Sequence, residues 1–454
     1  MIVIVGAGTL LAEAAGLNGL RMVARAGVLL WLLLNLRRMR GIELIFLSAA
    51  AAVVVLVVAL SADPIGVLGV SLDRAGLFLT FVSSLNLLRD AARSSTAVRR
   101  GGYYLISQSP ARRYAALTLG CHLFTIVLNM GALTLLGAMV MRSNTLAAAG
   151  GDPTVVAIRE RRMVTALIRG FGATFMWTPT GISVGYILSL VPTLTWFDML
   201  PVAVGLSFAC MLIGWIVDRL QWRSSARRAA LPPPPVSPRE LLPMLGVTAL
   251  ILLSVLAAKF LFSLGLLVAV LSTVPFVAAL WLVIQHWRFG LAAAISVTRR
   301  RLRRHAIDLL PQTRPESVVL GSAAFMGVGI SALVEAGGIG AWLSSVQLPG
   351  PAVAIGAFLL VLLLAQVGVT PLITVTIVGT TIMQMSPLPI PPLALVIALQ
   401  AAWSLSSSIS PYTGGTLTLA RMLGKPSSIV QQWNATYGVA CSALIVVMYL
   451  VWLL

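Results

Sequence analysis

The chain has 454 residues, of which 59% are hydrophobic and 10% are charged, and its formal net charge is +19. A soluble fold could not cover so much apolar surface, so the composition predicts an integral membrane protein. The placement of the positive charge argues against a nucleic-acid partner, because the basic residues lie between apolar segments, as the positive-inside bias requires. These basic clusters are at 37–40, 89–113, 142–162, 219–228 and 299–304, and at Arg421 and Lys425.

The apolar segments predict helical spans rather than a β-barrel. Residues 42–60, for example, are enough to cross about 30 Å of hydrocarbon as a helix, and no stretch alternates for long as barrel strands do. Residues 1–41 are expected to form one or two membrane segments. The first twenty residues are apolar, but they lack a basic start and carry Glu13, so they do not indicate a cleaved signal. The three cysteines lie inside apolar segments and are expected to be buried rather than bonded to each other or to a metal: Cys121, Cys210 and Cys441.

The first half of the chain, residues 42–218, takes a regular order when every basic cluster is placed in the cytoplasm. One segment begins and ends beside arginines, so it is predicted to enter from the cytoplasm and return as a re-entrant hairpin with its tip at Asn129 to Ala132. A later segment is interrupted at Thr178 to Gly181, because proline and glycine break helices. In chain order the segments are 42–60 outward, 64–88 inward, the hairpin 115–141, 163–190 outward and 200–217 inward.

The second half, residues 259–454, repeats this order with the opposite orientation. Its hairpin is flanked only by uncharged loops, so it should enter from outside, with its tip near Gln366 to Pro371. Its interrupted helix breaks at Ser410 to Gly414. In chain order the segments are 264–286 inward, the amphipathic surface stretch 288–305, 317–343 outward, the hairpin 351–384, 392–418 inward and 430–453 outward.

The basic, proline-rich stretch 219–240 separates the halves and is predicted to be an extended cytoplasmic linker. Residues 241–258 follow as an additional transmembrane helix. The predicted fold class is therefore an all-α polytopic membrane protein with two inverted-topology repeats, each holding a re-entrant hairpin and an interrupted helix.

Two matched motifs give the candidate substrate site. Each half has an amide-x-Gly step at its hairpin tip and, some way later, a Ser/Thr-Pro step closed by Thr-Gly. Interrupted segments at corresponding places in two halves are the best pointer in a sequence to a transporter's substrate site. The candidate substrate-binding residues are Asn129, Gly131, Thr178, Pro179, Thr180, Gly181 and Ser183 in the first half, and Gln366, Gly368, Thr370, Ser408, Ser410, Pro411, Thr413 and Gly414 in the second.

The chemistry of these motifs favours an anionic solute. No lysine or arginine lies in 128–137, 173–185, 365–374 or 404–416, the stretches that hold the tips and the breaks. A helix that begins at a break presents free N–H groups and about half a positive charge, which favour an anion. Unwound carbonyls can instead hold a cation, and Ser and Thr hydroxyls often only satisfy their own helix backbone.

Other polar residues have a structural and a functional reading. His122 shares a helical face with Asn129 and could carry a proton, although a hydrogen-bonded structural role is favoured. Asp90 and Glu335 occupy similar places in the two halves, and a role in capping helices or forming ion pairs is favoured over proton coupling. Trp177 and Trp403 flank the two breaks, either packed as aromatic residues or as walls of the pocket.

The order of these elements resembles the ion transporter superfamily, which includes divalent anion:sodium symporters and the membrane subunit of TRAP transporters. The likeness covers residues 42–454. VVLGSAAFMGVGISALVEAGGIGAWL at 318–343 is similar to the family's Gly-rich helix before the outer hairpin, and FLTFVSSLNLLRDAAR at 78–93 is its weaker counterpart. The resemblance implies an elevator-type carrier that is dimeric, with the hairpins and interrupted helices in the moving domain. It also implies a sodium ion as coupling ion, near Asn129, Thr180, Gln366 and Thr413, and no other cofactor.

Enzyme motifs are lacking in the sequence. There is no G-x-x-x-x-G-K-[ST] nucleotide motif, and the histidines His122, His286 and His305 are scattered. We therefore expect a bacterial inner-membrane secondary transporter, not an enzyme, that uses a sodium or proton gradient to move a small anionic organic solute. Two alternatives stay open: the membrane subunit of a carrier with a separate substrate-binding protein, and a membrane enzyme that acts on lipid-linked substrates.

Overall fold

The computed structural model describes residues 6, 8–11, 18–222 and 237–453. Within these residues every regular element is a helix, and nine helical stretches are long and apolar enough to cross a membrane. The prediction of an all-α polytopic membrane protein is confirmed. The predictions for 1–41 and for the linker 219–240 fall in part on residues 1–5, 7, 12–17 and 223–236, which lie outside the described residues.

The chain forms two compact units, and each draws on both halves of the sequence. Unit 1 is made of Met1–Ala91, Leu250–Leu348 and Leu372–Pro389, and unit 2 of Ala92–Ala249, Pro349–Pro371 and Ile390–Leu454. A repeat is a relation of sequence order, whereas a compact unit is defined by packing, so the two divisions do not coincide. The predicted repeat boundaries therefore stay a prediction.

Unit 1 is organised around the pair α3 (Ile42–Leu60) and α14 (Arg314–Ala336). An apolar cluster joins them, and Gly329 lets the backbones approach so closely that a Cβ there would lie 2.5 Å from Val53. At one end, Arg314 Nε donates to Glu43 Oε1 over 2.8 Å, which neutralises a carboxylate inside an apolar helix. The other helices largely or wholly in unit 1 are α2 (Asn18–Leu36), α4 (Pro64–Arg93), α12 (Leu266–His286), α13 (Leu291–Arg304), α15 (Ile339–Ser345) and α17 (Pro371–Met383).

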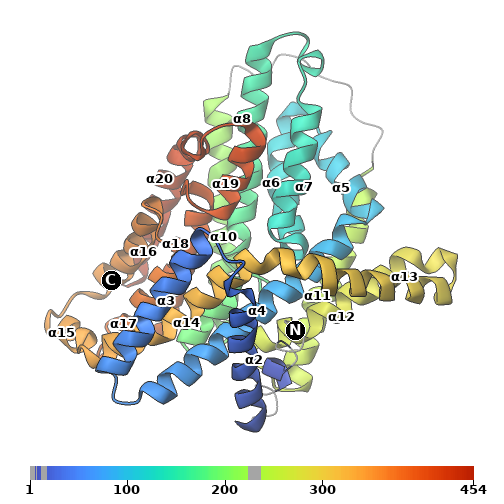
Figure 1. Cartoon of the computed structure of the whole chain (residues 1–454). Coiled ribbons are helices and arrows are strands. Elements are labelled where there is room, and N and C mark those ends of the chain that lie inside the picture. Colours follow the sequence, from blue (N-terminus) through green and yellow to red (C-terminus); the bar gives the residue numbers. More distant parts are fainter. Residues whose placement is uncertain (1–5, 7, 12–17, 223–236, 454) are drawn as a thin grey trace. The chain divides into compact units, whose positions relative to one another are not determined.

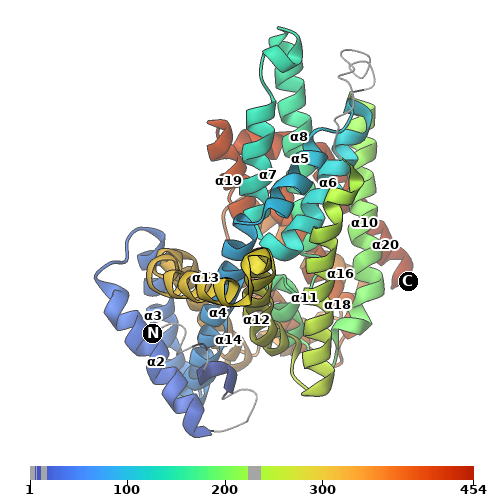
Figure 2. The ribbon, with the colours of Figure 1, turned by 90° about the vertical axis from the view of Figure 1, so that its right-hand side faces the viewer.

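Unit 2 holds the helices that carry the candidate site. Figures 1 and 2 show α6 (Pro110–Leu128), α7 (Met130–Ser143) and α8 (Pro153–Thr174) side by side, and these helices pack directly on one another. The remaining helices of the unit are α5 (Thr96–Ile106), α9 (Ile182–Leu190), α10 (Trp196–Gln221), α16 (Gly350–Gln366), α18 (Pro392–Ile409), α19 (Gly414–Leu423) and α20 (Ser427–Trp452), while α11 (Leu242–Leu261) crosses the boundary between the units.

Both predicted helix breaks are present. α8 ends at Thr174 and α9 begins at Ile182, and α18 ends at Ile409 before α19 begins at Gly414. The tip of the first hairpin is also where the sequence places it, because Asn129 alone separates α6 from α7. In the second hairpin, α16 and most of α17 belong to different units. Whether either hairpin is re-entrant in a bilayer stays a prediction.

Three boundaries differ from the sequence prediction. The basic stretch before the first interrupted helix is itself helical, because Asp152 caps α8 and Pro153 begins it. The basic stretch 89–113 contains α5, which buries one face. The predicted span 317–343 is two helices, since Gly338 has a φ of 63° and ends the continuity between α14 and α15.

Candidate functional site

The two interrupted helices, α8 and α18, are joined by a row of polar contacts. Gln400, Ser404 and Ser408 lie at intervals of four on α18, so they share one helical face. Their side chains donate to carbonyls of α8 in reverse order: Gln400 to Phe175, Ser404 to Gly172 over 2.8 Å, and Ser408 to Ile168 over 3.2 Å. The helices are therefore antiparallel here, and α18 supplies a donor to the Phe175 carbonyl that the end of α8 leaves without a helical partner.

The first break is buried, and its side chains form hydrogen bonds within the protein. Thr178, Thr180 and Ser183 are all buried, with 3% exposure at most. Thr180 donates to the Ile126 carbonyl over 2.9 Å and lies 3.1 Å from the Thr178 hydroxyl, and Ser183 donates to the Phe175 carbonyl over 2.9 Å. Because these hydroxyls are bonded within the protein, their contacts fix the connection between α8 and α9. Pro179 and Gly181 are buried in the same break.

The tip of the first hairpin lies near both breaks. Asn129 has a φ of 48°, which asparagine tolerates better than most residues, and its Oδ1 accepts from the Met130 N–H over 2.7 Å. One turn earlier, Ile126 meets the first break through Thr180. Met130 meets the second break, since a Cβ on Gly414 would lie 3.4 Å from its Cε. Gly131 is buried just behind the tip.

The second break is more open than the first. Ser410 is buried and donates to the Ala365 carbonyl over 2.6 Å, but Tyr412 is 58% exposed and Gly414 is also exposed. Thr413 is the N-cap of α19 and makes no side-chain capping bond to it. The first N–H groups of α19 are thus left for other acceptors, and the positive end of its dipole points to an accessible place.

The tip of the second hairpin lies beside this open break. Gln366 donates to the Leu362 carbonyl on its own helix, and its Oε1 accepts from Gln431 of α20 over 3.2 Å. Gly368 has a φ of 96° and packs against the Tyr412 ring, from which an added Cβ would be 3.6 Å away. Thr370 is half-buried at the end of the tip.

The structure thus places every predicted substrate-binding residue in unit 2 and divides these residues into two environments. The first break is buried and internally bonded. The second break forms an accessible group with the two hairpin tips, which we call the open-break cluster: Asn129, Met130, Gln366, Gly368, Tyr412, Thr413 and Gly414. Pro411, in the same break, is buried. Ser408 belongs instead to the polar row between α8 and α18. That these residues bind solute stays a prediction.

The oxygens suggested for sodium already have protein partners. Asn129 Oδ1 and Gln366 Oε1 each accept a hydrogen bond, Thr180 donates to Ile126, and Thr413 donates to the Ser407 carbonyl over 3.3 Å. Each oxygen keeps a second lone pair, so the residue types are compatible with a sodium ion. The described residues contain no cluster of three or more His, Cys, Asp or Glu side chains that could hold a metal.

His122 is held in a complete hydrogen-bond network. Trp177 donates its indole N–H to Nε2 over 3.1 Å, and Nδ1 faces the Gly170 carbonyl at 3.3 Å and the Thr174 hydroxyl at 3.1 Å. Since Nε2 accepts from Trp177, the contacts assign a neutral ring with its proton on Nδ1. The contacts fit the structural role favoured from the sequence. Trp403 is buried in unit 2, whereas Asp90 and Glu335 lie in unit 1.

Arg169 is a central feature that the sequence analysis missed. It is 1% exposed, and within the described residues it forms no ion pair. Its Nε donates to Asn434 Oδ1 over 2.8 Å, its Nη1 to the Tyr114 hydroxyl over 2.9 Å and to the Gly214 carbonyl over 3.2 Å, and its carbon lies 4.7 Å from the Tyr437 ring centre. One guanidinium thus ties α8 to α6, α10 and α20. The signal was an arginine inside the apolar stretch 163–175.

Comparisons with known proteins bear on the fold. No protein-family model and no curated protein sequence matches the chain significantly. The crystal structure of the YdaH transporter from Alcanivorax borkumensis is similar, with a TM-score of 0.56 and 17% identity over 90% of this chain and 97% of that one. The chain shares this fold. MtrF of Neisseria gonorrhoeae, described as an antimetabolite efflux pump, aligns over 82% of this chain and 80% of its own with 14% identity, but its TM-score of 0.47 is too low to support an argument.

Proposed function

We propose that the chain is a secondary transporter of a small organic anion and that the open-break cluster binds this solute. The observation that carries the proposal is the uncapped N-terminus of α19 beside the Asn129 tip, at an accessible place in the unit that holds both interrupted helices. The similarity of fold to the YdaH transporter is consistent with a solute site in this membrane protein. Because a fold alone does not imply a function, the proposal rests on the chemistry of the site.

The chemistry of the cluster suits a carboxylate. The α19 N-terminus offers N–H donors and a partial positive charge, and the Asn129 amide adds neutral polar groups without a fixed cation. Gly414 and Gly415 begin the helix, and Gly414 has no Cβ to keep a solute from the backbone. These groups can recognise the carboxylate by hydrogen bonds. Because the solute forms no ion pair with a lysine or arginine there, its release is not slowed by such a pair.

The transport mechanism is part of the same proposal. An elevator mechanism carries its site within one rigid body, and the predicted site residues all belong to unit 2. We further propose that the protein works as a homodimer in a bacterial inner membrane. The driving gradient is sodium or protons, which flux measurements with each gradient distinguish.

Solute affinity in purified protein tests the site. The probes are acetate, succinate, citrate and benzoate, each added with and without sodium, because a ligand of the folded state raises its apparent thermal stability. For the anion that binds, Asn129→Ala is expected to weaken affinity by about 1 to 3 kcal/mol, or about 5- to 150-fold. Gly414→Val should abolish binding.

The matched control is Gly356→Val on α16, where a Cβ would meet nothing within 4 Å, and it should keep the wild-type affinity. A surface change, Arg421→Gln on α19, should also leave affinity intact. Unchanged affinity in Asn129→Ala and Gly414→Val, together with its loss in Arg421→Gln, would place the site elsewhere.

A further inference from the structure

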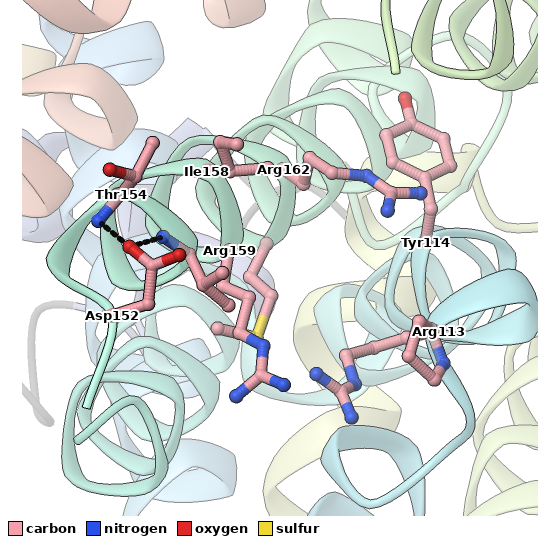
Figure 3. Close-up of a pocket in the computed structure, with 10 residues that line it drawn as sticks. Arg113, Tyr114, Asp152, Thr154, Ile158, Arg159 and Arg162 are labelled. Atoms are coloured by element: carbon pink, nitrogen blue, oxygen red, sulfur yellow. Dashed lines mark hydrogen bonds between the residues drawn. The ribbon is translucent and has the colours of Figure 1, made fainter. Parts of the chain in front are cut away.

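Three arginines gather at the N-terminal ends of α6 and α8, apart from the open-break cluster. Here a cavity of about 210 Å³ is lined by Arg113, Arg159 and Arg162, with Tyr114, Asp152 and Thr154 among its other walls. Figure 3 shows the guanidinium groups of Arg113 and Arg159 projecting into the same opening. All these residues belong to unit 2, and none is in the open-break cluster.

Asp152, the acidic residue that lines the pocket, and Asp218, which pairs with the lining residue Arg162, are both engaged. Asp152 Oδ1 accepts from the N–H groups of Thr154 and Val155 at the start of α8, as the dashed lines in Figure 3 mark. Arg162 forms a bidentate ion pair with Asp218, in which Nε donates to Oδ1 over 2.9 Å and Nη2 donates to Oδ2 over 2.6 Å. One of the three arginines is therefore compensated within the protein, and the other two are not compensated in this way.

Among the described residues, the hydrogen-bond acceptors of Arg113 and Arg159 are carbonyl groups. Arg113 Nε donates to the Gln108 carbonyl over 2.9 Å, and Arg159 Nη1 donates to the Ala148 carbonyl over 2.6 Å. The Nη2 of Arg159 is buried without a hydrogen-bond partner, and within 18–222 and 237–453 neither arginine forms an ion pair. A buried charged nitrogen without an acceptor is costly, so the pocket lacks an acceptor that a ligand could supply.

The electrostatics of Arg113 support the same reading. This residue belongs to the basic stretch 89–113, ahead of the predicted membrane segment. Burial, followed by the charges on Arg159 and Arg162, lowers the pKa of Arg113 to about 10, so it is still a cation at neutral pH. It also lies in the first turn of α6, where the helix dipole repels a cation.

We propose that this pocket binds a phosphate group through Arg113 and Arg159. Two guanidinium forks facing one cavity match the tetrahedral oxygens of phosphate, each fork offering paired N–H donors. A bound phosphate gives Arg159 Nη2 its missing acceptor and relieves the repulsion between the arginines. The group belongs either to an anionic phospholipid headgroup or to a soluble phosphate.

Thermal stability of the purified full chain tests the proposal and separates the two sources. One arm adds inorganic phosphate at constant ionic strength, with chloride as reference. The other adds phosphatidylcholine vesicles with and without phosphatidic acid. Stabilisation by inorganic phosphate identifies a soluble ligand, and stabilisation by phosphatidic acid alone identifies a lipid. Either result supports phosphate binding in this pocket only when the stabilisation depends on Arg113 and Arg159.

Arg113→Gln and Arg159→Gln should each reduce the ligand-induced shift at least threefold, and Arg159→Lys should retain an intermediate shift because it keeps the charge but not the fork. Arg142→Gln, an equal change of charge at the exposed end of α7, should leave the shift unchanged. If no probe stabilises the wild type, or if the pocket variants respond like Arg142→Gln, the proposal is wrong. The readout is independent of transport, so it can fail while the proposed function stands.

Discussion

Arg169→Lys is expected to lower the free energy of unfolding by about 2 to 4 kcal/mol, because a lysine cannot reproduce the planar fork that serves several acceptors at once. Arg169 bonds to Asn434, Tyr114 and Gly214 from different nitrogens, and these acceptors lie on three other helices. An ammonium group has three donors on one atom and is more strongly hydrated, so burial at this place costs more. The measurement is thermal unfolding of the purified protein in detergent.

The matched control is Arg161→Lys, on the same helix. Arg161 lies over the Trp222 ring at 5.5 Å and is only half-buried, so this change should cost about 0 to 1 kcal/mol. Equal unfolding temperatures for the two variants would mean that the Arg169 guanidinium does not join the four helices.

Gly172→Ala should cost about as much, roughly 2 to 4 kcal/mol, by forcing α8 and α18 apart. A Cβ at this glycine would lie 1.9 Å from the Ser408 hydroxyl and 3.0 Å from the Ser404 carbonyl. The helices must separate to admit the methyl group, which breaks the row of polar contacts between them. Unfolding of the purified protein again gives the measurement.

Two variants make the interpretation specific. Gly205→Ala on α10 adds the same methyl group where nothing lies within 4 Å, and it should be neutral or stabilise by up to about 1 kcal/mol through helix propensity. The double variant Gly172→Ala with Ser408→Gly removes the closest clash and should recover part of the loss. A Gly172→Ala protein as stable as Gly205→Ala would contradict the close approach of the two helices.

The helix breaks could be predicted because their cause is local. Pro179, Gly181, Pro411 and Gly414 lie in apolar segments and favour a break, although a membrane-length helix can also hold a proline, as α10 does at Pro201 and α12 at Pro275. The hairpin tip at Asn129 follows from the same kind of reasoning, since arginines flank both ends of its segment. The alternation of apolar runs and basic clusters likewise fixed most helix positions.

The difference in accessibility between the two breaks could not be predicted, because it depends on contacts between distant residues. Gln400 completes the first break by bonding to Phe175, and Arg169 reaches Asn434 across most of the chain. No local pattern records which face of α18 meets α8, or that Tyr412 stays exposed while Thr180 is buried. The pocket of Arg113 and Arg159 is of the same kind, since α6 and α8 bring the two residues together.

Solute uptake into proteoliposomes tests the central claim most directly. A sodium or proton gradient is imposed across the membrane of proteoliposomes that contain the wild-type protein. The radiolabelled solute is the anion that raises the thermal stability of the purified protein. We predict gradient-driven accumulation by the wild type and by Gly356→Val, and none by Gly414→Val, although all three are folded and inserted. No gradient-dependent accumulation by the wild type, or full accumulation by Gly414→Val, would contradict a transport site at the open-break cluster.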